Sequence, residues 1–321
     1  MLTSLEELNV LVVGDAIIDQ YHYVVPLGQT GKGNVLAVRY DTEEQFAGGA
    51  IAVANHVSRF VHSATLLSAL GDTDSQEGYI RSKLQPNVMP EFAYFVNAPT
   101  VVKRRFVDSD LSKLFEIYYY EEHPKLQDNG RKICGWLEQN LSRFDAVIVA
   151  DFGNGLVSTE MIQLLCDKAR FLAVNTQVNS GNRGYHVINR YPRADFVSLN
   201  EPELRLSAHN RHDPLEIVCE KVADITSASY LAVTRGTLGV SMLDVTSRTF
   251  NKVPALSSRV LDRVGAGDAF LSLSALCLSK KLPPDVAAFI GSVAAAIDVQ
   301  IVCNREPVDP VGLKKYVSTL L

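Results

Sequence analysis

Short apolar runs rich in β-branched residues alternate along this chain with segments of helical periodicity. Runs of this kind are typical of buried strands in a parallel sheet, and the helical patterns between them are typical of crossover helices. The runs, with the polar or glycine residues that close them, lie at 10–14, 65–72, 145–155, 172–177, 196–203 and 231–236. The pattern predicts an α/β fold in which helices cover a mostly parallel central sheet, with residues 1–321 forming a single domain.

Two regions differ from this pattern because apolar and polar residues alternate in them between turn signals. They are residues 20–46 and residues 100–120. Alternation with a period of two is typical of strands that expose one face. We expect these regions to form a small antiparallel β flap, or lid, outside the main sheet. Because flap strands leave exposed edges that can pair with another copy, we also expect a homodimer.

Composition and charge argue against several classes of protein. The chain has 321 residues, of which 47% are hydrophobic, and its net charge of -5 argues against a nucleic-acid binder that relies on a basic face. Its five cysteines are widely spaced, with neither a disulfide framework nor a zinc-binding spacing. The N-terminus lacks a signal-peptide pattern, and no apolar run reaches the ~18 residues of a membrane span. We therefore expect a cytoplasmic protein with no membrane or nucleic-acid partner.

The segment 260–270 carries the strongest chemical signal. Gly265, Ala266 and Gly267 precede a long apolar helix, and small residues there let the backbone approach a ligand. The first N–H groups of a helix attract anions, so these residues predict an anion hole. Asp268 follows in the first turn, where it can accept a proton from an attacking hydroxyl. A Gly-rich turn with Asp near a helix N-terminus is an equally good interpretation of these four residues alone.

Further candidates follow predicted strands, at the ends where ligands bind in open α/β sheets. Asp15 and Asp19 follow the first strand and are candidates to accept hydrogen bonds from sugar hydroxyls. Gly48 and Gly49 precede a helix and allow close approach of the backbone to a ligand. Turn, cap and packing roles are the alternative for each of these residues. Arg105, within a run of three basic residues, is a candidate to meet a phosphate on the substrate, although such a run is more often a solvated strand face.

The motif Asp-Arg-Val-Gly-Ala-Gly-Asp at 262–268 resembles the C-terminal signature of the ribokinase-like (phosphofructokinase-B type) carbohydrate kinases, with Arg263 where the family has Thr. The block 47–55 resembles the family's N-terminal signature, with Ala52 in place of the usual Asn and Val61 in place of a later Gly. Five such blocks follow the family order between about residues 8 and 310. The resemblance implies a ribokinase-like three-layer α/β/α sandwich and ATP-dependent phosphoryl transfer to a sugar.

The same resemblance implies roles for individual residues. It makes Asp268 the catalytic base and puts Asp262 where the family often holds a monovalent cation such as K⁺. Asn200 and Glu203 match a motif that helps to position Mg²⁺ on the nucleotide, usually through water. Asn followed three residues later by Glu is also a helix-capping pattern, and both interpretations can hold together. Contacts to ATP are implied for Asn200, Thr234 and Gly236.

Within the family, the pattern is most similar to the heptose-phosphate kinase branch. Residues 151–155 resemble its Asp-Tyr-x-Lys-Gly block, and residues 172–177 fill the place of its Asp-Pro-Lys block. This similarity implies that Asp151 contacts the substrate, and that the substrate is a sugar or sugar phosphate of surface-polysaccharide synthesis. It also implies a nucleotidyltransferase domain or partner.

Departures from the branch keep two alternatives open. Asn154 and Gln177 replace its two lysines, which lends support to a nucleoside or simple hexose kinase. The alternative of another class is a non-catalytic nucleotide- or sugar-binding relative, indicated by Arg263, Ala52 and Val61.

Overall fold

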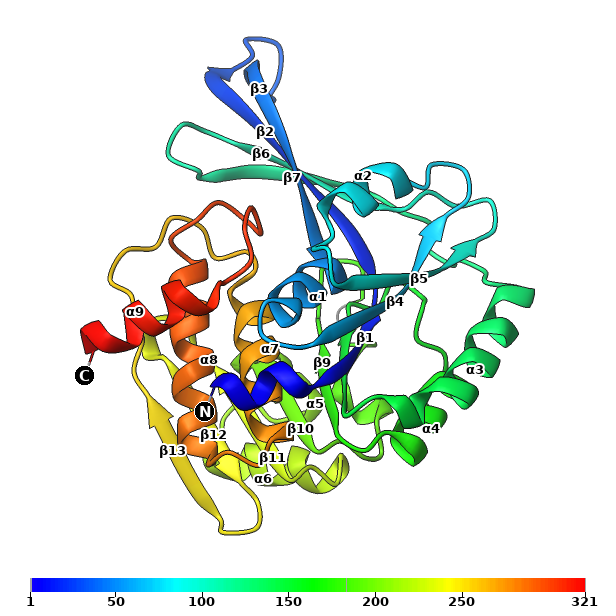
Figure 1. The fold of residues 1–321 in the computed structure, drawn as a ribbon. Helices are drawn as coiled ribbons and strands as arrows, with labels where there is room; N and C mark the ends of the chain where they lie inside the picture. The colour runs from blue at the N-terminus through cyan, green and yellow to red at the C-terminus, as the bar shows by residue number, and fades with distance from the viewer. Residues whose placement is uncertain (1, 183, 321) are drawn as a thin grey trace.

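The computed structural model describes residues 2–182 and 184–320, and its centre is a nine-stranded sheet (Figure 1). The strands from β11 to β5 in the spatial order are parallel, and β12 and β13 add antiparallel strands at one edge. This arrangement confirms the predicted α/β fold with a mostly parallel sheet. In spatial order the strands are β13 (Thr249–Val253), β12 (Val240–Asp244), β11 (Tyr230–Thr234), β10 (Phe196–Asn200), β9 (Leu172–Thr176), β8 (Ala146–Asp151), β1 (Asn9–Gly14), β4 (Ser63–Gly71) and β5 (Val88–Phe95).

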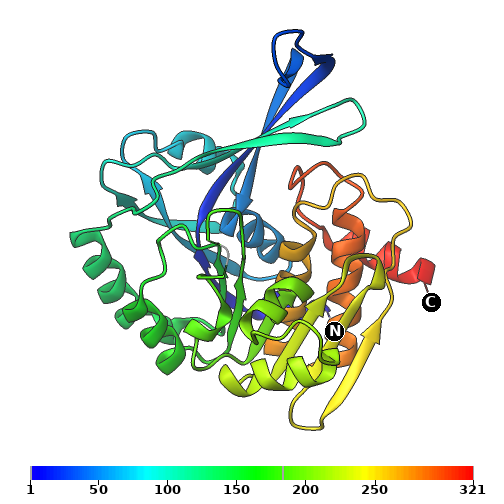
Figure 2. The same ribbon diagram turned by 180° about the vertical axis from the view of Figure 1, so that it is seen from behind.

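Helices cover both faces of this sheet because successive strand residues point to opposite sides. In β1, Val10 and Val12 belong to one hydrophobic core, and Leu11 and Val13 belong to the other. The first core is covered by α1 (Ala50–Ser58), α2 (Glu77–Lys83), α7 (Ala266–Ser279), α8 (Pro284–Asp298) and α9 (Pro310–Leu320). The second is covered by α3 (Asp128–Asn140), α4 (Thr159–Lys168), α5 (Glu201–Ser207) and α6 (Leu215–Ile225). The two groups lie on opposite sides of the sheet in Figures 1 and 2, which confirms the three-layer sandwich.

Four short 3₁₀ helices complete the described elements. They are η1 (Leu2–Glu7), η2 (Leu141–Arg143), η3 (Ile188–Arg190) and η4 (Gly236–Leu238).

Across residues 2–182 and 184–320, no helix is long and apolar enough to cross a membrane. All five cysteines are buried and free, and burial raises the pKa of Cys277 to about 12, so that thiol stays protonated and unreactive.

A second sheet of four strands projects away from the three layers (Figures 1 and 2). It contains β3 (Leu36–Gly49), β2 (Ala16–Gln29), β6 (Val101–Val107) and β7 (Lys113–Tyr119) in that spatial order. The pairs β2–β3 and β6–β7 are antiparallel, as predicted, and a parallel pairing of β2 with β6 joins them. The predicted small flap is therefore confirmed. Its parallel central pair could not be read from the alternation, because a period of two is the same in either direction.

The base of the flap is fixed to the main sheet by a tight backbone crossing. Only Asp15 separates β1 from β2, and β3 runs directly into α1 through Gly49. Gly49 has a φ of 60°, and a Cβ atom there would lie 2.4 Å from the carbonyl oxygen of Asp15. That oxygen accepts a hydrogen bond from the N–H of Ala50 at 3.0 Å. Glycine is therefore required at this point, where the flap meets the carboxyl ends of the parallel strands.

Candidate active site

A cleft of about 840 Å³ lies where the flap, the carboxyl ends of the strands and the start of α7 meet. Candidate residues from sequence positions that are far apart line it together. They are Asp19, Gly49, Arg105, Asn200, Glu203, Thr234, Gly236, Gly265, Ala266, Gly267 and Asp268. Four other candidates are not among the lining residues, namely Asp15, Gly48, Asp151 and Asp262. The fold therefore brings most of the predicted site into one cavity.

The turn before α7 aims the N-terminus of this helix at the cleft. Gly265 has a φ of 103°, and a Cβ atom there would lie 2.3 Å from Oδ1 of Asn304 and 2.8 Å from Oδ2 of Asp298. Gly267 differs, because a Cβ atom there would have no neighbour within 4 Å. The helix has no side-chain cap, so its first N–H groups keep their capacity to bind an anion.

Asp268 lies in the first turn of α7 and is partly buried. Burial is the main cause that raises the pKa of this carboxyl group to about 7; the nearby charges of Asp19 and Glu203 also raise it, and Lys103 lowers it. A carboxylate with a pKa close to neutrality can accept a proton from a hydroxyl group and release it again. Asp268 therefore combines a place in the first turn of α7 with a pKa at which a carboxylate can exchange a proton near neutral pH.

Asp19 and Arg105 form a buried ion pair across the paired strands β2 and β6. Nη1 of Arg105 donates to Oδ1 of Asp19, and Nε of Arg105 donates to Oε1 of Glu116 at 3.1 Å. The guanidinium carbon also lies 5.6 Å from the centre of the Tyr21 ring. Gly48 makes room for this pair, because a Cβ atom at Gly48 would lie 2.0 Å from Oδ2 of Asp19. Arg105 faces the cleft, and its charge is paired with the carboxylates of Asp19 and Glu116.

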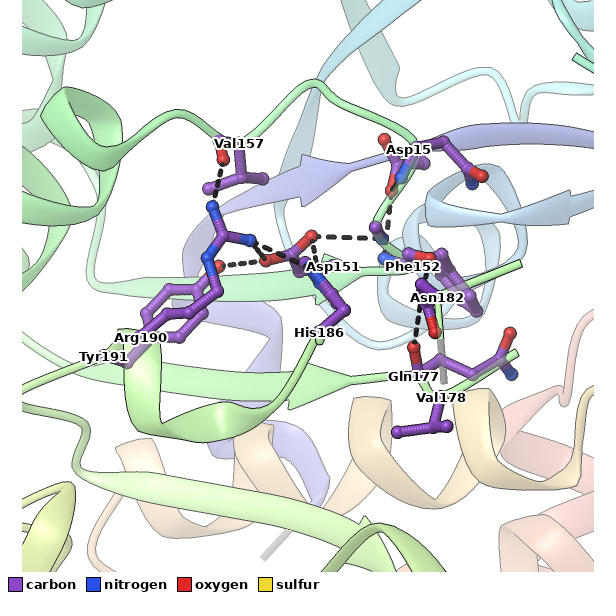
Figure 3. A network of polar contacts seen from close by, with 12 residues as sticks. Asp15, Asp151, Phe152, Val157, Gln177, Val178, Asn182, His186, Arg190 and Tyr191 are labelled. Carbon is purple, nitrogen blue, oxygen red and sulfur yellow. Dashed lines mark hydrogen bonds and ion pairs between the residues drawn. The ribbon is translucent and has the colours of Figure 1, made fainter. Parts of the chain in front are cut away.

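Asp15 stabilises the chain that follows β8, and the network around it is shown in Figure 3. Its Oδ2 accepts hydrogen bonds from the N–H groups of Phe152 at 2.9 Å and Asn154 at 3.2 Å. Burial and the neighbouring charge of Asp151 raise the pKa of Asp15 to about 6. These contacts correspond to the turn-carboxylate alternative that the sequence left open.

Asp151 is also committed to neighbouring side chains in Figure 3. Its Oδ2 accepts from the Tyr191 hydroxyl at 2.8 Å and from Arg190 at 3.1 Å, and its Oδ1 lies 2.9 Å from Nε2 of His186. Because Asp151 is buried and does not line the cleft, the structure does not bring it to the position of a substrate contact. It attaches the segment after β9 to the end of β8.

Asn200 and Glu203 form a complete capping box at the start of α5. Oδ1 of Asn200 accepts from the N–H of Glu203 at 2.8 Å, and Oε2 of Glu203 accepts from the N–H of Asn200 at 2.9 Å. Burial raises the pKa of Glu203 to about 7. The cap interpretation therefore holds. Both residues also line the cleft, and their oxygen atoms suit a hydrated Mg²⁺, which prefers oxygen ligands and retains water.

Asp262 ties the loop before α7 to the flap. Its carboxylate accepts from the Tyr21 hydroxyl at 2.6 Å and from three N–H groups, those of Arg263 at 2.7 Å, Cys303 at 3.1 Å and Val264 at 3.2 Å. All four donors are neutral, so the negative charge of this buried group is stabilised without a cation partner in these contacts.

Two residues in or beside the site were not among the candidates. Asp298 is fully buried beside Gly265, and neither of its carboxylate oxygens has a hydrogen-bond partner within the described chain. An acid at the end of the apolar run of α8 was its only signal in the sequence. Lys103 lines the cleft on β6, and it was visible only as part of a basic run.

The site and the fold together define a class of protein, a phosphoryl-transferring enzyme of the ribokinase fold. The sequence profile described as pfkB family carbohydrate kinase matches residues 7–307, and this chain belongs to that family. Similar curated proteins include the bifunctional protein HldE of Koribacter versatilis (strain Ellin345), which is 27% identical over 300 residues, covering 91% of this chain and 59% of that protein. The bifunctional protein HldE of Proteus mirabilis (strain HI4320) is 26% identical over 303 residues, covering 93% of this chain and 61% of that protein.

Solved structures with the same fold include phosphofructokinase-2 from Escherichia coli in complex with potassium. Its TM-score is 0.76 at 15% identity, and the alignment covers 98% of this chain and 99% of that one. Arabidopsis thaliana ribokinase complexed with ribose and ATP has a TM-score of 0.69 at 16% identity, covering 97% of this chain and 99% of that one. These similarities concern the fold.

The two glycines of the α7 turn should respond differently to substitution. Gly265→Ala should lower the free energy of unfolding by about 1–3 kcal/mol, because the new Cβ meets packed oxygens at a positive φ. Gly267→Ala should leave stability within about 1 kcal/mol of the parent, because its Cβ meets no protein atom, but it should abolish the thermal shift produced by Mg·AMP-PNP. Urea denaturation and thermal-shift measurements on both variants check this. An unaltered nucleotide shift in Gly267→Ala would contradict the anion hole.

Proposed function

We propose that this protein transfers the γ-phosphoryl group of Mg·ATP to a hydroxyl group of a sugar or sugar phosphate. The observation that carries the proposal is the presence in one cleft of a carboxylate with a pKa near 7 and a helix N-terminus free of caps. A base and an anion hole side by side are what attack by an alcohol on a phosphoryl group requires.

In this mechanism Asp268 accepts the proton of the acceptor hydroxyl as its oxygen attacks the γ-phosphorus in line. The amides from Gly265 to Gly267 hold the negative charge that builds on the phosphoryl oxygens. Asp19 accepts a hydrogen bond from another hydroxyl of the acceptor and so orients it. Positioning of this kind supplies much of the rate in phosphoryl transfer.

The nucleotide lies, in this proposal, toward the ends of β10 and β11. Thr234 and Gly236 contact its phosphates, and Glu203 and Asn200 hold Mg²⁺ through water. Bound Mg²⁺ neutralises charge on the β- and γ-phosphates. Apolar residues form a shelf for adenine at the same end of the cleft. These are Pro254, Leu256, Ala295, Ala296 and Val299.

A monovalent cation beside Asp262 is a further part of the proposal. Asp262 and Asp298 are buried carboxylates near the anion-hole turn, and neither is paired with Lys or Arg in the described ranges. A cation such as K⁺ would balance this charge. Turnover measured in potassium salts and in tetramethylammonium salts tests the assignment.

The acceptor class rests on the relatives named HldE and on the sequence resemblance to the heptose-phosphate kinase branch. We propose a sugar or sugar phosphate of surface-polysaccharide metabolism. The chain spans 59% to 61% of the length of those relatives, which are named as bifunctional proteins. A nucleotidyltransferase domain or partner is also part of the proposal.

A nucleoside or simple hexose is the second candidate for the acceptor, favoured by the neutral residues Asn154 and Gln177. A coupled ADP-release screen over sugars, sugar phosphates and nucleosides separates these candidates, and a protein that binds Mg·ATP but releases no ADP would be a non-catalytic relative.

Asp268 provides the first test. Asp268→Asn should reduce kcat about 100-fold or more while Mg·AMP-PNP still raises the melting temperature. In the parent, kcat/KM should rise with pH up to about 7, because Asp268 must be ionised to accept a proton. A residual activity above a few per cent of the parent would rule out Asp268 as the base.

The pH dependence of the stability of Asp268→Asn, compared with that of the parent, provides a second test. The pKa of Asp268 is raised in the folded state, so folding takes up a proton, and stability falls as pH rises from about 4 to about 7. Asp268→Asn should remove this loss and be more stable than the parent at pH 8 but not at pH 4. Equal stability differences at both pH values would contradict the raised pKa.

We also propose that the flap mediates a homodimer. β3 and β7 are the free edges of its sheet, and large apolar side chains are exposed on its strands. They include Val25, Leu27, Leu36, Tyr40, Phe115, Ile117 and Tyr119.

Sedimentation velocity should therefore give a dimer at micromolar concentration. Leu27→Glu, on the flap, should yield a monomer because it buries a charge in the contact. Met89→Glu is the matched control on β5, since Met89 is 62% exposed and Leu27 is 65% exposed. A monomeric parent protein, or equal effects of the two substitutions, would contradict the flap interface.

A further inference from the structure

The carboxylate of Asp19, the proposed acceptor contact, is also bound by the loop that follows α8. Its Oδ1 accepts from Nη1 of Arg105, and its Oδ2 accepts from the thiol of Cys303 at 3.8 Å. Cys303 is fully buried, and burial raises the pKa of its thiol well above the ordinary value, with the charge of Asp19 raising it as well. The thiol therefore stays protonated and remains a donor to Asp19.

Tyr21 and Cys303 both bind a second buried carboxylate, that of Asp262. Its Oδ2 accepts from the Tyr21 hydroxyl at 2.6 Å and from the N–H of Cys303 at 3.1 Å. Burial raises the pKa of Tyr21 far above the ordinary value, so its hydroxyl stays protonated and donates. The guanidinium carbon of Arg105, which binds Asp19, lies 5.6 Å from the centre of the same ring. Asp19 and Asp262 are therefore connected by two routes, one through each of these residues.

The other oxygen of Asp262 holds the backbone that leads into the anion-hole turn. Oδ1 accepts from the N–H groups of Arg263 at 2.7 Å and Val264 at 3.2 Å, and Gly265 follows directly. The loop that donates to Asp262 continues into Asn304, whose Oδ1 lies 2.3 Å from the position of a Cβ atom on Gly265. A shift of Asp262 or of this loop therefore acts on the turn that begins α7.

An apolar cluster surrounds these contacts. It joins the flap to the loop after α8, and Val264 packs against it. Its buried members are Tyr21, Phe46, Val107, Val302 and Cys303. Because hydrogen bonds are stronger and more cooperative in a low-dielectric interior, a change at one end of such a network affects the other end.

We infer that Tyr21 and Cys303 are positioning residues that couple Asp19 to the anion-hole turn, so that an acceptor bound at Asp19 helps to order the amides that receive the phosphoryl group. Neither residue is among those that line the cleft, so both act through Asp19 and Asp262. The inference rests on the proposed kinase function and adds a link between its two substrates. A purely structural attachment of the flap is the competing explanation, and it predicts independent effects at the two ends.

Hydrogen exchange of the backbone amides at 263–267 tests the coupling without acceptor or nucleotide. Asp19→Asn removes the charge that the thiol binds, and Cys303→Ala removes the thiol, so each should speed this exchange about tenfold. The double variant should exchange no faster than Asp19→Asn alone, because both changes break the same link. Cys303→Ser keeps a donor at this position and should restore most of the protection.

Tyr21→Phe, which removes the hydroxyl that binds Asp262, should also speed exchange at 263–267. Tyr23→Phe is the matched control, because Tyr23 lies two residues further along β2 and its hydroxyl donates to Glu44 at 2.7 Å. This control should leave the exchange at 263–267 unchanged. Equal effects of the two substitutions would overturn the inference.

Nucleotide binding and turnover extend the test. In calorimetric titration with Mg·AMP-PNP at a fixed potassium concentration, Tyr21→Phe and Cys303→Ala should weaken binding about three- to tenfold, and Tyr23→Phe should not. With the acceptor that is most productive in the ADP-release screen, Cys303→Ala should lower kcat about tenfold, while ATP hydrolysis without acceptor stays within about twofold of the parent.

The outcomes separate this inference from the kinase proposal. Absence of Mg·AMP-PNP binding to the parent, or of ADP release with every acceptor, would count against the kinase proposal, while the exchange measurement would still decide the coupling. The inference is overturned if the effects of Asp19→Asn and Cys303→Ala multiply in the double variant. It is also overturned if Tyr21→Phe binds Mg·AMP-PNP as tightly as the parent does.

Discussion

The turn at Gly265 is the constraint on which the rest of the site depends. Its backbone adopts a φ of 103°, and side-chain oxygens of Asn304 and Asp298 lie where a Cβ atom would be placed, so no other residue fits without displacement of buried groups. This turn sets the direction of α7, and α7 in turn carries the free amides and Asp268 to the cleft. Apolar side chains of α7 and α8 pack together in the first hydrophobic core and fix the position of α7. A local backbone requirement thus fixes the geometry of the proposed chemistry.

Negative charge dominates the region around this turn. Asp15, Asp19, Glu203 and Asp268 are buried or partly buried near the strand ends, and burial raises the pKa of Asp15, Glu203 and Asp268. Such a cleft favours bound cations, and it holds Asp268 near the pH at which a base works best. The flap supplies the opposing charges from Arg105 and Lys103. The same strands that cover the cleft therefore also set its electrostatics.

The sequence was sufficient for the parts of this account that depend on local pattern. Apolar runs ending in polar residues predicted the parallel sheet, and small residues before an apolar helix predicted the turn at 265–267. Asn200 and Glu203 predicted both a cap and a cleft position, and the structure has both. The roles assigned to these cleft residues in catalysis remain predictions.

Features that depend on strand register and on long-range packing could not be predicted. Arg105 was expected to be available to a substrate, but the parallel pairing of β2 with β6 brings it beside Asp19. Asp151 was expected to contact the substrate because residues 151–155 resemble a block of the heptose-phosphate kinase branch, yet Tyr191 and Arg190, some 40 residues later, bind its carboxylate. The same register makes Lys103 the cross-strand neighbour of Asp19, a proximity that no basic run in a sequence can reveal.

In the proposed mechanism, the N-terminus of α7 receives the phosphoryl group in front of Asp268. A crystal structure of the protein with Mg·AMP-PNP tests it most directly. We expect γ-phosphoryl oxygens within about 3 Å of the amides that follow Gly265, with the Asp268 carboxylate on the open side of the phosphorus. A γ-phosphoryl group bound elsewhere in the cleft, with those amides contacting only water or protein, would contradict it.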